Sequence, residues 1–170
     1  MPPRLKLIAV FVVCAAPIAL AWLAWHFSWG TGSPGNYGEL IAPRTLSGAP
    51  FDELRGKWLL VSFDSAACDA YCEEKLYFMR QVRTAQGKDQ TRLQRVWLLT
   101  DAASPRPQLV AAIEGTLISR ARPEGFPGNP VDHIYLVDPL GNLMLRFPRN
   151  PDPSKILKDV QRLMKYSQVG

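Results

Sequence analysis

No Asp, Glu, Lys or Arg occurs from Leu7 to Trp29, and this stretch constrains the chain more than any other feature. A helix needs about 20 apolar residues to cross a bilayer, and residues 7–29 meet that length. Arg4 and Lys6 precede the stretch, and basic residues accumulate on the cytoplasmic side of membrane helices. We therefore predict one transmembrane anchor at residues 7–29, with the N-terminus in the cytoplasm and the rest of the chain on the other side.

A cleaved signal peptide is the alternative to an anchor. The uncharged stretch is longer than the apolar region of a typical signal peptide, and no A-x-A cleavage site follows it. Cys14 is not expected to carry a lipid, because it would lie mid-membrane, where it serves as a small apolar side chain. We expect the anchor to stay uncleaved.

Length and charge restrict what the rest of the chain can be. With 170 residues there is room for one ordinary domain besides the anchor. The net charge is +5, but Arg4 and Lys6 supply two of those charges, and the remaining charges of both signs are interspersed. This distribution does not indicate nucleic-acid binding. We expect a cytoplasmic tip and anchor at 1–29, a linker rich in Gly and Pro at 30–50, and a folded domain at 51–168.

Beyond residue 51, short apolar runs alternate with amphipathic segments. Runs rich in strand formers predict strands, and apolar positions on one helical face predict helices. The predicted strands are 57–65, 95–101, 133–138 and 143–147, and the predicted helices are 69–86, 105–116 and a last one that starts at Asp152 and Pro153. The last two strands flank a turn that contains Gly141 and form an antiparallel hairpin. This order predicts an α/β domain whose central sheet is flanked by helices.

Cys68 and Cys72 are the cysteines outside the predicted anchor, and they follow the first predicted strand, where a helix begins. A helix N-terminus favours a thiolate and lowers the pKa of a thiol. At positions i and i+4 the two side chains would share a helix face, with Cα atoms about 6 Å apart, within reach of a disulfide. The same pair could bind a soft metal such as Cu(I), which prefers thiolates. The nearby Asp69, Glu73 and Glu74 oppose thiolate formation.

A purely structural disulfide is the other interpretation of the pair, and it would fit an oxidising compartment. However, the loop between Cys68 and Cys72 is so short that closing it stabilises the fold little by loop entropy. The spacing therefore favours redox or metal chemistry at these two residues, without deciding between them.

Three stretches of the sequence carry a resemblance to a known family: GKWLLVSFDSAACDAYC, VWLLTDAASPRP and VDHIYLVDPLGNL. Residues 51–166 resemble the Sco family of cytochrome c oxidase assembly proteins, which are membrane-anchored thioredoxin-like domains that bind copper and exchange thiols. More narrowly, the chain resembles short Sco-like transmembrane proteins associated with cytochrome oxidase genes in proteobacteria. The resemblance implies a thioredoxin-like fold, an inner-membrane location with a periplasmic domain, and a cytochrome c oxidase subunit or its assembly proteins as partners.

The resemblance also implies a Cu(I) site formed by Cys68, Cys72 and His133. In the Sco family, two cysteines at this spacing and the His of a V-D-H motif are the copper ligands. This sequence departs from the family at two points: Glu73 stands where the family usually has Pro, and His133 comes only two residues before Tyr135, which requires a three-residue deletion. Without a ligand role, His133 would be a polar residue at the mouth of a strand, bonded to backbone or water.

Three functions are consistent with these residues. The first is a Sco-like assembly factor for cytochrome c oxidase, which binds Cu(I) or exchanges thiols at Cys68 and Cys72. The second is a general membrane-tethered thiol–disulfide oxidoreductase, with Cys68 as the attacking thiolate and Cys72 as the resolving thiol. Such proteins usually have the spacing C-x-x-C, one residue shorter than here. The third is a thioredoxin-like scaffold that binds no metal.

Overall fold

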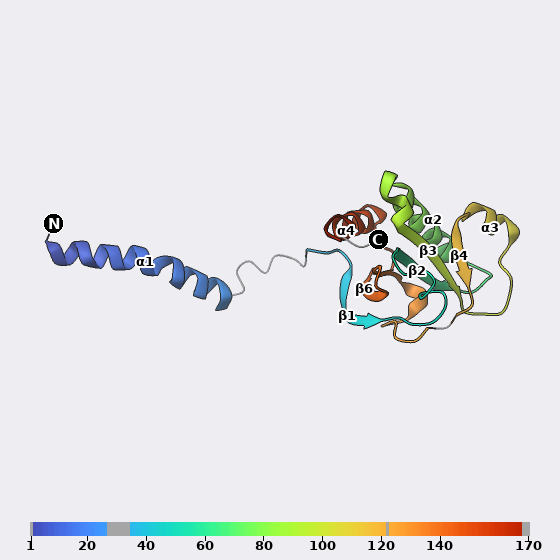
Figure 1. The fold of residues 1–170 in the computed structure, drawn as a ribbon, viewed down its shortest axis with the longest axis horizontal. Coiled ribbons are helices and arrows are strands. Elements are labelled where there is room, and N and C mark those ends of the chain that lie inside the picture. Colours follow the sequence, from blue (N-terminus) through green and yellow to red (C-terminus); the bar gives the residue numbers. More distant parts are fainter. Residues whose placement is uncertain (1, 27–34, 122, 168–170) are drawn as a thin grey trace. The chain divides into compact units, whose positions relative to one another are not determined.

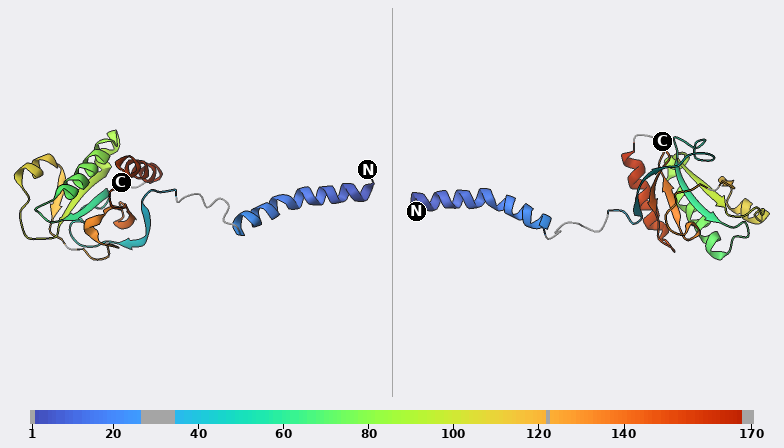
Figure 2. Two further views of the ribbon diagram at one scale, coloured as in Figure 1. Left: turned by 180° about the vertical axis from the view of Figure 1, so that it is seen from behind. Right: turned by 90° about the horizontal axis from the view of Figure 1, so that it is seen from below.

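The structure is a computed structural model that describes residues 2–26, 35–121 and 123–167. The chain separates into two compact units, Met1–Gly35 and Asn36–Gly170, which are described one at a time. The first unit contains one helix, and the second contains the strands that the structure describes (Figures 1 and 2).

Helix α1 (Pro3–His26) forms most of the N-terminal unit and has Pro17 inside it. The predicted anchor at 7–29 is therefore helical as far as His26, and residues 27–29 lie outside the described residues. In the described ranges, none of the helices combines the length and the apolar character needed to cross a membrane. The predicted helix is present, whereas the predicted transmembrane span is not found.

A mixed sheet forms the centre of the second unit, and its six strands lie in the order β1-β6-β5-β2-β3-β4. The strands are β1 (Glu39–Thr45), β2 (Trp58–Asp64), β3 (Leu93–Leu99), β4 (Thr116–Ser119), β5 (Ile134–Val137) and β6 (Asn142–Arg146). Strand β3 runs parallel to its neighbours β2 and β4. Strand β5 is antiparallel to β2 and β6, and β6 is antiparallel to β1.

The described part of this unit also contains three α-helices and two short 3₁₀ turns, and the last helix follows the final strand. These elements are α2 (Ala70–Thr84), α3 (Pro107–Ala112), α4 (Pro153–Tyr166), η1 (Gly87–Arg92) and η2 (Pro130–Asp132). Helix α2 follows β2, the strand at the centre of the sheet, and every residue of β2 is buried. This central position explains why β2 reads as a continuous apolar run, since a strand covered on both faces cannot alternate with polar residues.

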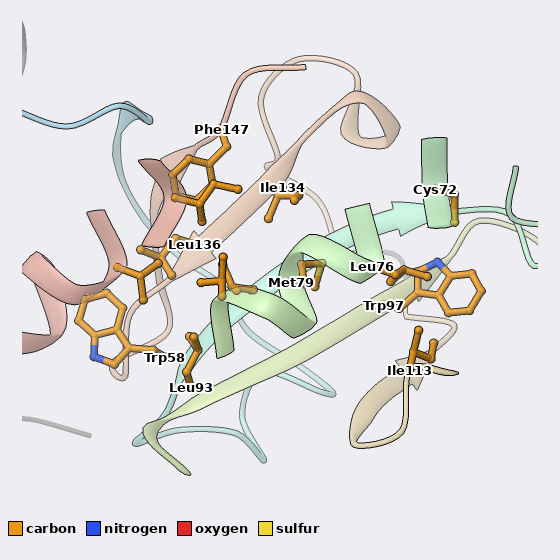
Figure 3. Close-up of a cluster of buried hydrophobic side chains, with 14 of the residues drawn as sticks. Trp58, Cys72, Leu76, Met79, Leu93, Trp97, Ile113, Ile134, Leu136 and Phe147 are labelled. Atoms are coloured by element: carbon orange, nitrogen blue, oxygen red, sulfur yellow. The ribbon is translucent and has the colours of Figure 1, made fainter. Parts of the chain in front are cut away.

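The two faces of the sheet are covered differently. Side chains from α2, α3 and α4 pack on one face, which we call the helix-covered face, and Figure 3 shows Leu76 and Met79 of α2 packed among strand residues there. The opposite face, here called the loop-covered face, packs against Phe51, Phe126 and other loop residues. Because side chains alternate along a strand, neighbours in β2 such as Leu60 and Val61 belong to different faces. The prediction of helices flanking the sheet is thus correct for one face only.

Two strands lie where the sequence predicts none. Strand β1 falls inside the predicted linker 30–50, so the folded unit begins near Asn36 rather than at residue 51. Strand β4 begins at Thr116, the last residue of the predicted helix 105–116. The helix itself is shorter than predicted and spans Pro107–Ala112. Both are edge strands with mostly exposed or half-buried residues, and their hydrogen-bond partners are distant in sequence. The remaining predicted strands and helices are confirmed within a few residues.

Candidate functional site

The two cysteines lie at the start of α2 and are joined by a disulfide, with Cα atoms 5.2 Å apart. Cys72 is in the first turn of the helix, as predicted. Cys68 precedes the helix, with a φ of 45°, so the two residues do not share a helix face. The reason is that Asp69 takes the N-cap position and its carboxylate accepts a hydrogen bond of 2.9 Å from the backbone N–H of Cys72.

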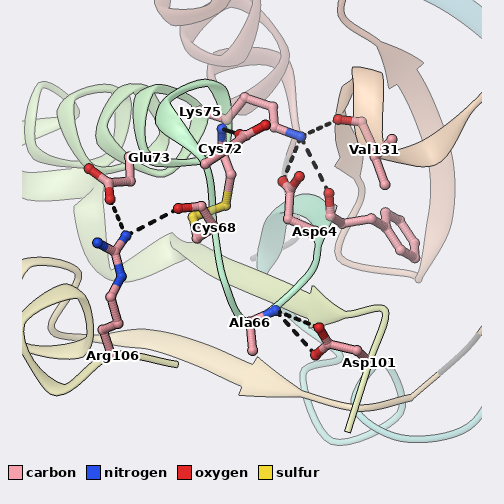
Figure 4. Close-up of a disulfide and its surroundings, with 11 residues drawn as sticks. Asp64, Ala66, Cys68, Cys72, Glu73, Lys75, Asp101, Arg106 and Val131 are labelled. Carbon is pink, nitrogen blue, oxygen red and sulfur yellow. Dashed lines mark hydrogen bonds and ion pairs between the residues drawn. A yellow bond between two sulfur atoms is a disulfide. The ribbon is translucent and has the colours of Figure 1, made fainter. Parts of the chain in front are cut away.

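The turn that carries Cys68 is held by several hydrogen bonds. The backbone N–H of Cys68 donates to the carbonyl oxygen of Ser65 at 3.1 Å. The N–H of Ala66 donates to the carboxylate of Asp101, on the loop after β3, also at 3.1 Å (Figure 4). These bonds hold Cys68 in the left-handed region, which costs a residue other than Gly about 1–2 kcal/mol. Cys68 is 3% exposed and Cys72 0%, so a partner reaching the sulfurs must displace part of this turn.

A buried ion pair lies next to the disulfide. Nζ of Lys75 is 2.7 Å from Oδ2 of Asp64, and the two side chains are 1% and 12% exposed (Figure 4). Lys75 follows Cys72 by three residues on α2, so both lie on the same helix face. Nζ also donates to the carbonyl oxygens of Phe63 and Val131. The charge of the ammonium group is therefore balanced by Asp64, and the group is hydrogen-bonded inside the core.

Burial decides the protonation behaviour of Asp64. Removal from water raises the pKa of its carboxyl above the ordinary value, and the hydrogen bond and charge of Lys75 oppose this rise. The pair was not predicted, although the sequence contains an indication of it. Lys75 interrupts the apolar stripe of α2 formed by Cys72, Leu76 and Met79, and Asp64 ends an apolar strand. A charged residue on the core-facing side of a helix calls for a buried counter-charge.

A second, exposed ion pair lies on the other side of Cys68. Nη2 of Arg106 donates to the backbone carbonyl of Cys68 at 3.1 Å and to the carboxylate of Glu73 (Figure 4). The side chains of Arg106 and Glu73 are 55% and 48% exposed. From the sequence, Glu73 was expected to oppose thiolate formation by its charge. In the structure an arginine offsets that charge, and its partner is too distant in sequence to be recognised from spacing.

The loop that carries His133 lies beside the N-terminal part of α2. Tyr71, in the first turn of α2, donates its hydroxyl to the carbonyl of Asp132 at 2.8 Å, and Lys75 reaches Val131. His133 lies just after η2, and its Nδ1 is 2.8 Å from the carbonyl oxygen of Phe147. Because a carbonyl only accepts, Nδ1 carries the proton of this bond. The imidazole lines a pocket of about 290 Å³ together with Tyr37, Glu39, Arg146, Pro148 and Arg149.

The expected three-residue metal site is not assembled in the structure. Within residues 2–26, 35–121 and 123–167, no group of three His, Cys, Asp or Glu side chains is arranged to hold a metal ion. The sulfurs of Cys68 and Cys72 are bonded to each other, which leaves no thiolate for a metal. His133 is instead hydrogen-bonded to backbone, as the alternative interpretation of that residue expected.

Fold and site together define the class of protein. A central strand leads through a short turn into a helix with a cysteine pair at its N-terminus, and this arrangement in a mixed sheet is that of a thioredoxin-like domain. Residues 58–167 match the model of the family described as "Transmembrane-like, thioredoxin-like, C-terminal domain". The match covers more than half of the sequence, and the chain belongs to this family.

Solved structures of Sco proteins share this fold at low sequence identity. Apo Sco1 from Thermus thermophilus superposes with a TM-score of 0.55 and 16% identity, over 78% of this chain and 99% of that chain. Copper-bound Sco1 from yeast gives a TM-score of 0.55 and 17% identity, over 80% and 96%. A SCO1/SenC family lipoprotein from Bacillus anthracis strain Ames gives 0.50 and 17%, over 78% and 98%. The predicted thioredoxin-like fold is thereby confirmed. No curated protein matches this chain.

Proposed function

We propose that this protein is a Sco-like factor in the assembly of cytochrome c oxidase and that it acts by thiol–disulfide exchange at Cys68 and Cys72. One observation carries the proposal: the disulfide lies at the N-terminus of α2, and the buried pair formed by Asp64 at the end of β2 and Lys75 of α2 lies next to it. A disulfide that closes so short a loop adds little stability, and a buried ion pair is seldom a net gain over apolar packing. Reactivity accounts for both features better than stability does.

The exchange balances as a two-electron transfer between a dithiol and a disulfide. In the reduced protein the thiolate of Cys68 attacks one sulfur of a partner disulfide, forms a mixed disulfide and releases the other partner sulfur as a thiolate. Cys72 then loses its proton and attacks the sulfur of Cys68. This step forms the Cys68–Cys72 disulfide and releases the second partner sulfur, so the partner is reduced and this protein is oxidised. The released partner thiolate takes up a proton from water, which balances the proton that Cys72 gives up.

Single cysteine variants test this order of events. The reduced protein is mixed with a peptide disulfide taken from a cysteine-bearing oxidase subunit, and products are separated without reductant. Cys72→Ser should accumulate the mixed disulfide through Cys68, because the resolving thiol is missing. Cys68→Ser should form none. Cys14→Ser, in α1, is the matched control and should behave as the wild type. A wild-type domain that leaves the peptide disulfide intact would refute the exchange activity.

Delivery of copper is a second candidate function, with Cu(I) as cargo. When the disulfide is reduced, the sulfurs of Cys68 and Cys72 become two soft ligands of the kind that Cu(I) prefers. His133 supports a third ligand in one respect: its Nδ1 proton is directed at the carbonyl of Phe147, and such a bond commonly orients a metal-binding imidazole. The His133 loop is also tied to α2 through Tyr71. The residues fit a two-sulfur site, and the third ligand requires the loop to move.

A Cu(I) titration of the reduced protein distinguishes delivery from exchange. Cys68→Ser and Cys72→Ser should each lose tight Cu(I) binding, and His133→Ala should weaken it while the disulfide still forms. His26→Ala, which changes the other histidine of the chain, is the matched control and should leave binding unchanged. Unchanged affinity in His133→Ala means that the third ligand is absent. No uptake by the reduced wild type removes the delivery function and leaves exchange.

We further propose an inner-membrane location with the domain in the periplasm. The support is the uncharged stretch from Leu7 to Trp29 after Arg4 and Lys6, together with a family description that names a transmembrane-like class. Alkaline extraction of membranes should leave the full-length chain in the pellet. Recovery of a chain that starts near residue 30 in the soluble fraction would contradict this location and would indicate cleavage.

A further inference from the structure

Arg106 is held in place beside the cysteine pair. It lies between Pro105 and Pro107, and a residue that precedes proline is restricted to extended backbone, as its φ of −60° and ψ of 134° show. Its Nη2 is 3.1 Å from the carbonyl oxygen of Cys68, and four covalent bonds join that oxygen to the sulfur of the same residue. The guanidinium therefore lies within about 8 Å of the Cys68 sulfur, and Figure 4 shows the two side by side.

Glu73, the carboxylate that pairs with Arg106, is held much less firmly. Its side chain is 48% exposed, and the pair lies at the surface, where solvent screens an ion pair and makes it weak. The hydrogen bond from Arg106 to the carbonyl of Cys68 does not involve Glu73. By contrast, Lys75, also close to the disulfide, is buried against Asp64 and cannot offer its charge to another molecule. Arg106 thus presents a positioned cation whose present partner is exchanged at little cost.

We propose that Arg106 determines which partners exchange with Cys68, and that it selects peptides with an acidic side chain next to their reactive cysteine. A partner that forms a mixed disulfide with Cys68 must bring its own backbone to this turn, within reach of the guanidinium. The partner carboxylate then replaces Glu73 on Arg106. Arginine suits this task because its planar fork binds a carboxylate through two parallel hydrogen bonds. The inference rests on the proposed exchange function and names the class of substrate for it.

Three peptide disulfides of equal length test the inference, with acidic, neutral or basic residues beside the cysteine. The measured quantity is the ratio of second-order rate constants for the acidic and the basic peptide within each protein, so that changes in basal reactivity cancel. The wild type should favour the acidic peptide about fivefold at low salt, and salt should reduce the ratio. Arg106→Met should bring the ratio near one. Arg106→Lys keeps the charge without the fork and should give an intermediate ratio.

Glu73→Gln provides a test of the opposite sign, since it removes the carboxylate that competes with the partner. Its ratio should exceed that of the wild type. Arg120→Met is the matched control, because Arg120 is another exposed arginine that donates to loop carbonyls, those of Ala102 and Ala103. It should keep the wild-type ratio. A wild-type ratio near or below one, or an unchanged ratio in Arg106→Met, overturns the inference alone. No exchange with any of the three peptides overturns the proposed function as well.

Discussion

The two faces of the sheet differ in the polarity of the side chains buried on them. The loop-covered face is almost entirely apolar, with Val61, Leu98 and Tyr135 among its members. The helix-covered face contains a larger apolar cluster, but charged and polar side chains are also buried on that face. On the strands these are Ser62, Asp64 and Arg95, which alternate with residues of the other face, and on the helices they are Lys75 and Asp159. Burying such groups costs free energy that apolar side chains would not cost.

The difference shows that the free-energy cost of burying charged groups falls mainly on the helix-covered face. Arg95 illustrates it: burial, together with the charges of Arg83 and Arg80, lowers the pKa of its guanidinium to about 10. The cysteine pair belongs to the same face, next to Asp64 and Lys75. We conclude that the loop-covered face stabilises the fold, whereas the helix-covered face also organises the reactive site.

The strongest way to break this comparison is Lys75→Met. Asp64 then loses its counter-charge inside the core, and removal of one partner from a buried ion pair costs about 3–5 kcal/mol. Urea unfolding of the oxidised variant measures the loss. The double variant Lys75→Met with Asp64→Leu, which removes both charges, should recover most of it. A loss below about 1 kcal/mol in the single variant would show that water reaches the pair.

Leu98→Ala tests the loop-covered face. Leu98 is fully buried there, and removal of its side chain should lower the free energy of unfolding by about 3 kcal/mol. The rate of thiol exchange per folded molecule should stay at the wild-type value, because Leu98 and the cysteine pair belong to the clusters on opposite faces of the sheet. Exchange assays under conditions that keep the variant folded measure this rate. A large change in rate would mean that the two faces are coupled.

Tyr135→Phe examines the polar group that the loop-covered face does contain. The hydroxyl of Tyr135 donates to the carbonyl of Pro127 at 2.7 Å, and burial raises its pKa to about 12, so it stays protonated at neutral pH. Its loss should cost about 1 kcal/mol, the usual value for one hydrogen bond. Thermal unfolding measures the effect. A neutral result would indicate that the carbonyl of Pro127 finds water in its place.

The smallest expected effect is a pH dependence caused by Asp64. Its pKa is raised above 3.8 in the folded protein, so the folded state holds this proton more tightly than the unfolded state. The associated stability is fully present below pH 3.8 and is lost as the pH rises through the raised pKa. The stability of the wild type relative to Asp64→Asn should therefore fall as the pH rises from 3.8. Urea unfolding at several pH values measures this difference, and the opposite slope would contradict the burial of Asp64.

The elements predicted correctly from the sequence are those whose pattern is local. The apolar runs of β2 and β3 and the stripe of α2 record their burial directly in the chain. Strand β1 leaves no such record, because most of its residues are exposed and its hydrogen bonds go to β6, far along the sequence. Strand β4 also leaves no clear pattern in the sequence, because it is short and its residues are half-buried.

The site divides in the same way. Cys68 and Cys72 are close in sequence, so their spacing alone placed them within reach of a disulfide, and the structure joins them. The pairs Asp64–Lys75 and Glu73–Arg106 join different elements, and a list of charges does not reveal which of them meet. The left-handed backbone of Cys68 was not predicted, although the predicted helix 69–86 already began after this residue.

Strand β1 has a consequence for how this protein behaves at high concentration. As an outer strand of the sheet it would offer free N–H and C=O groups to another chain, the usual route to aggregation. Pro43 lies within β1 and has no N–H to donate, and the pairing with β6 is irregular between Leu40 and Arg44. Both features make this edge a poor template for a further strand, so the segment that completes the sheet also guards the protein against edge-to-edge association.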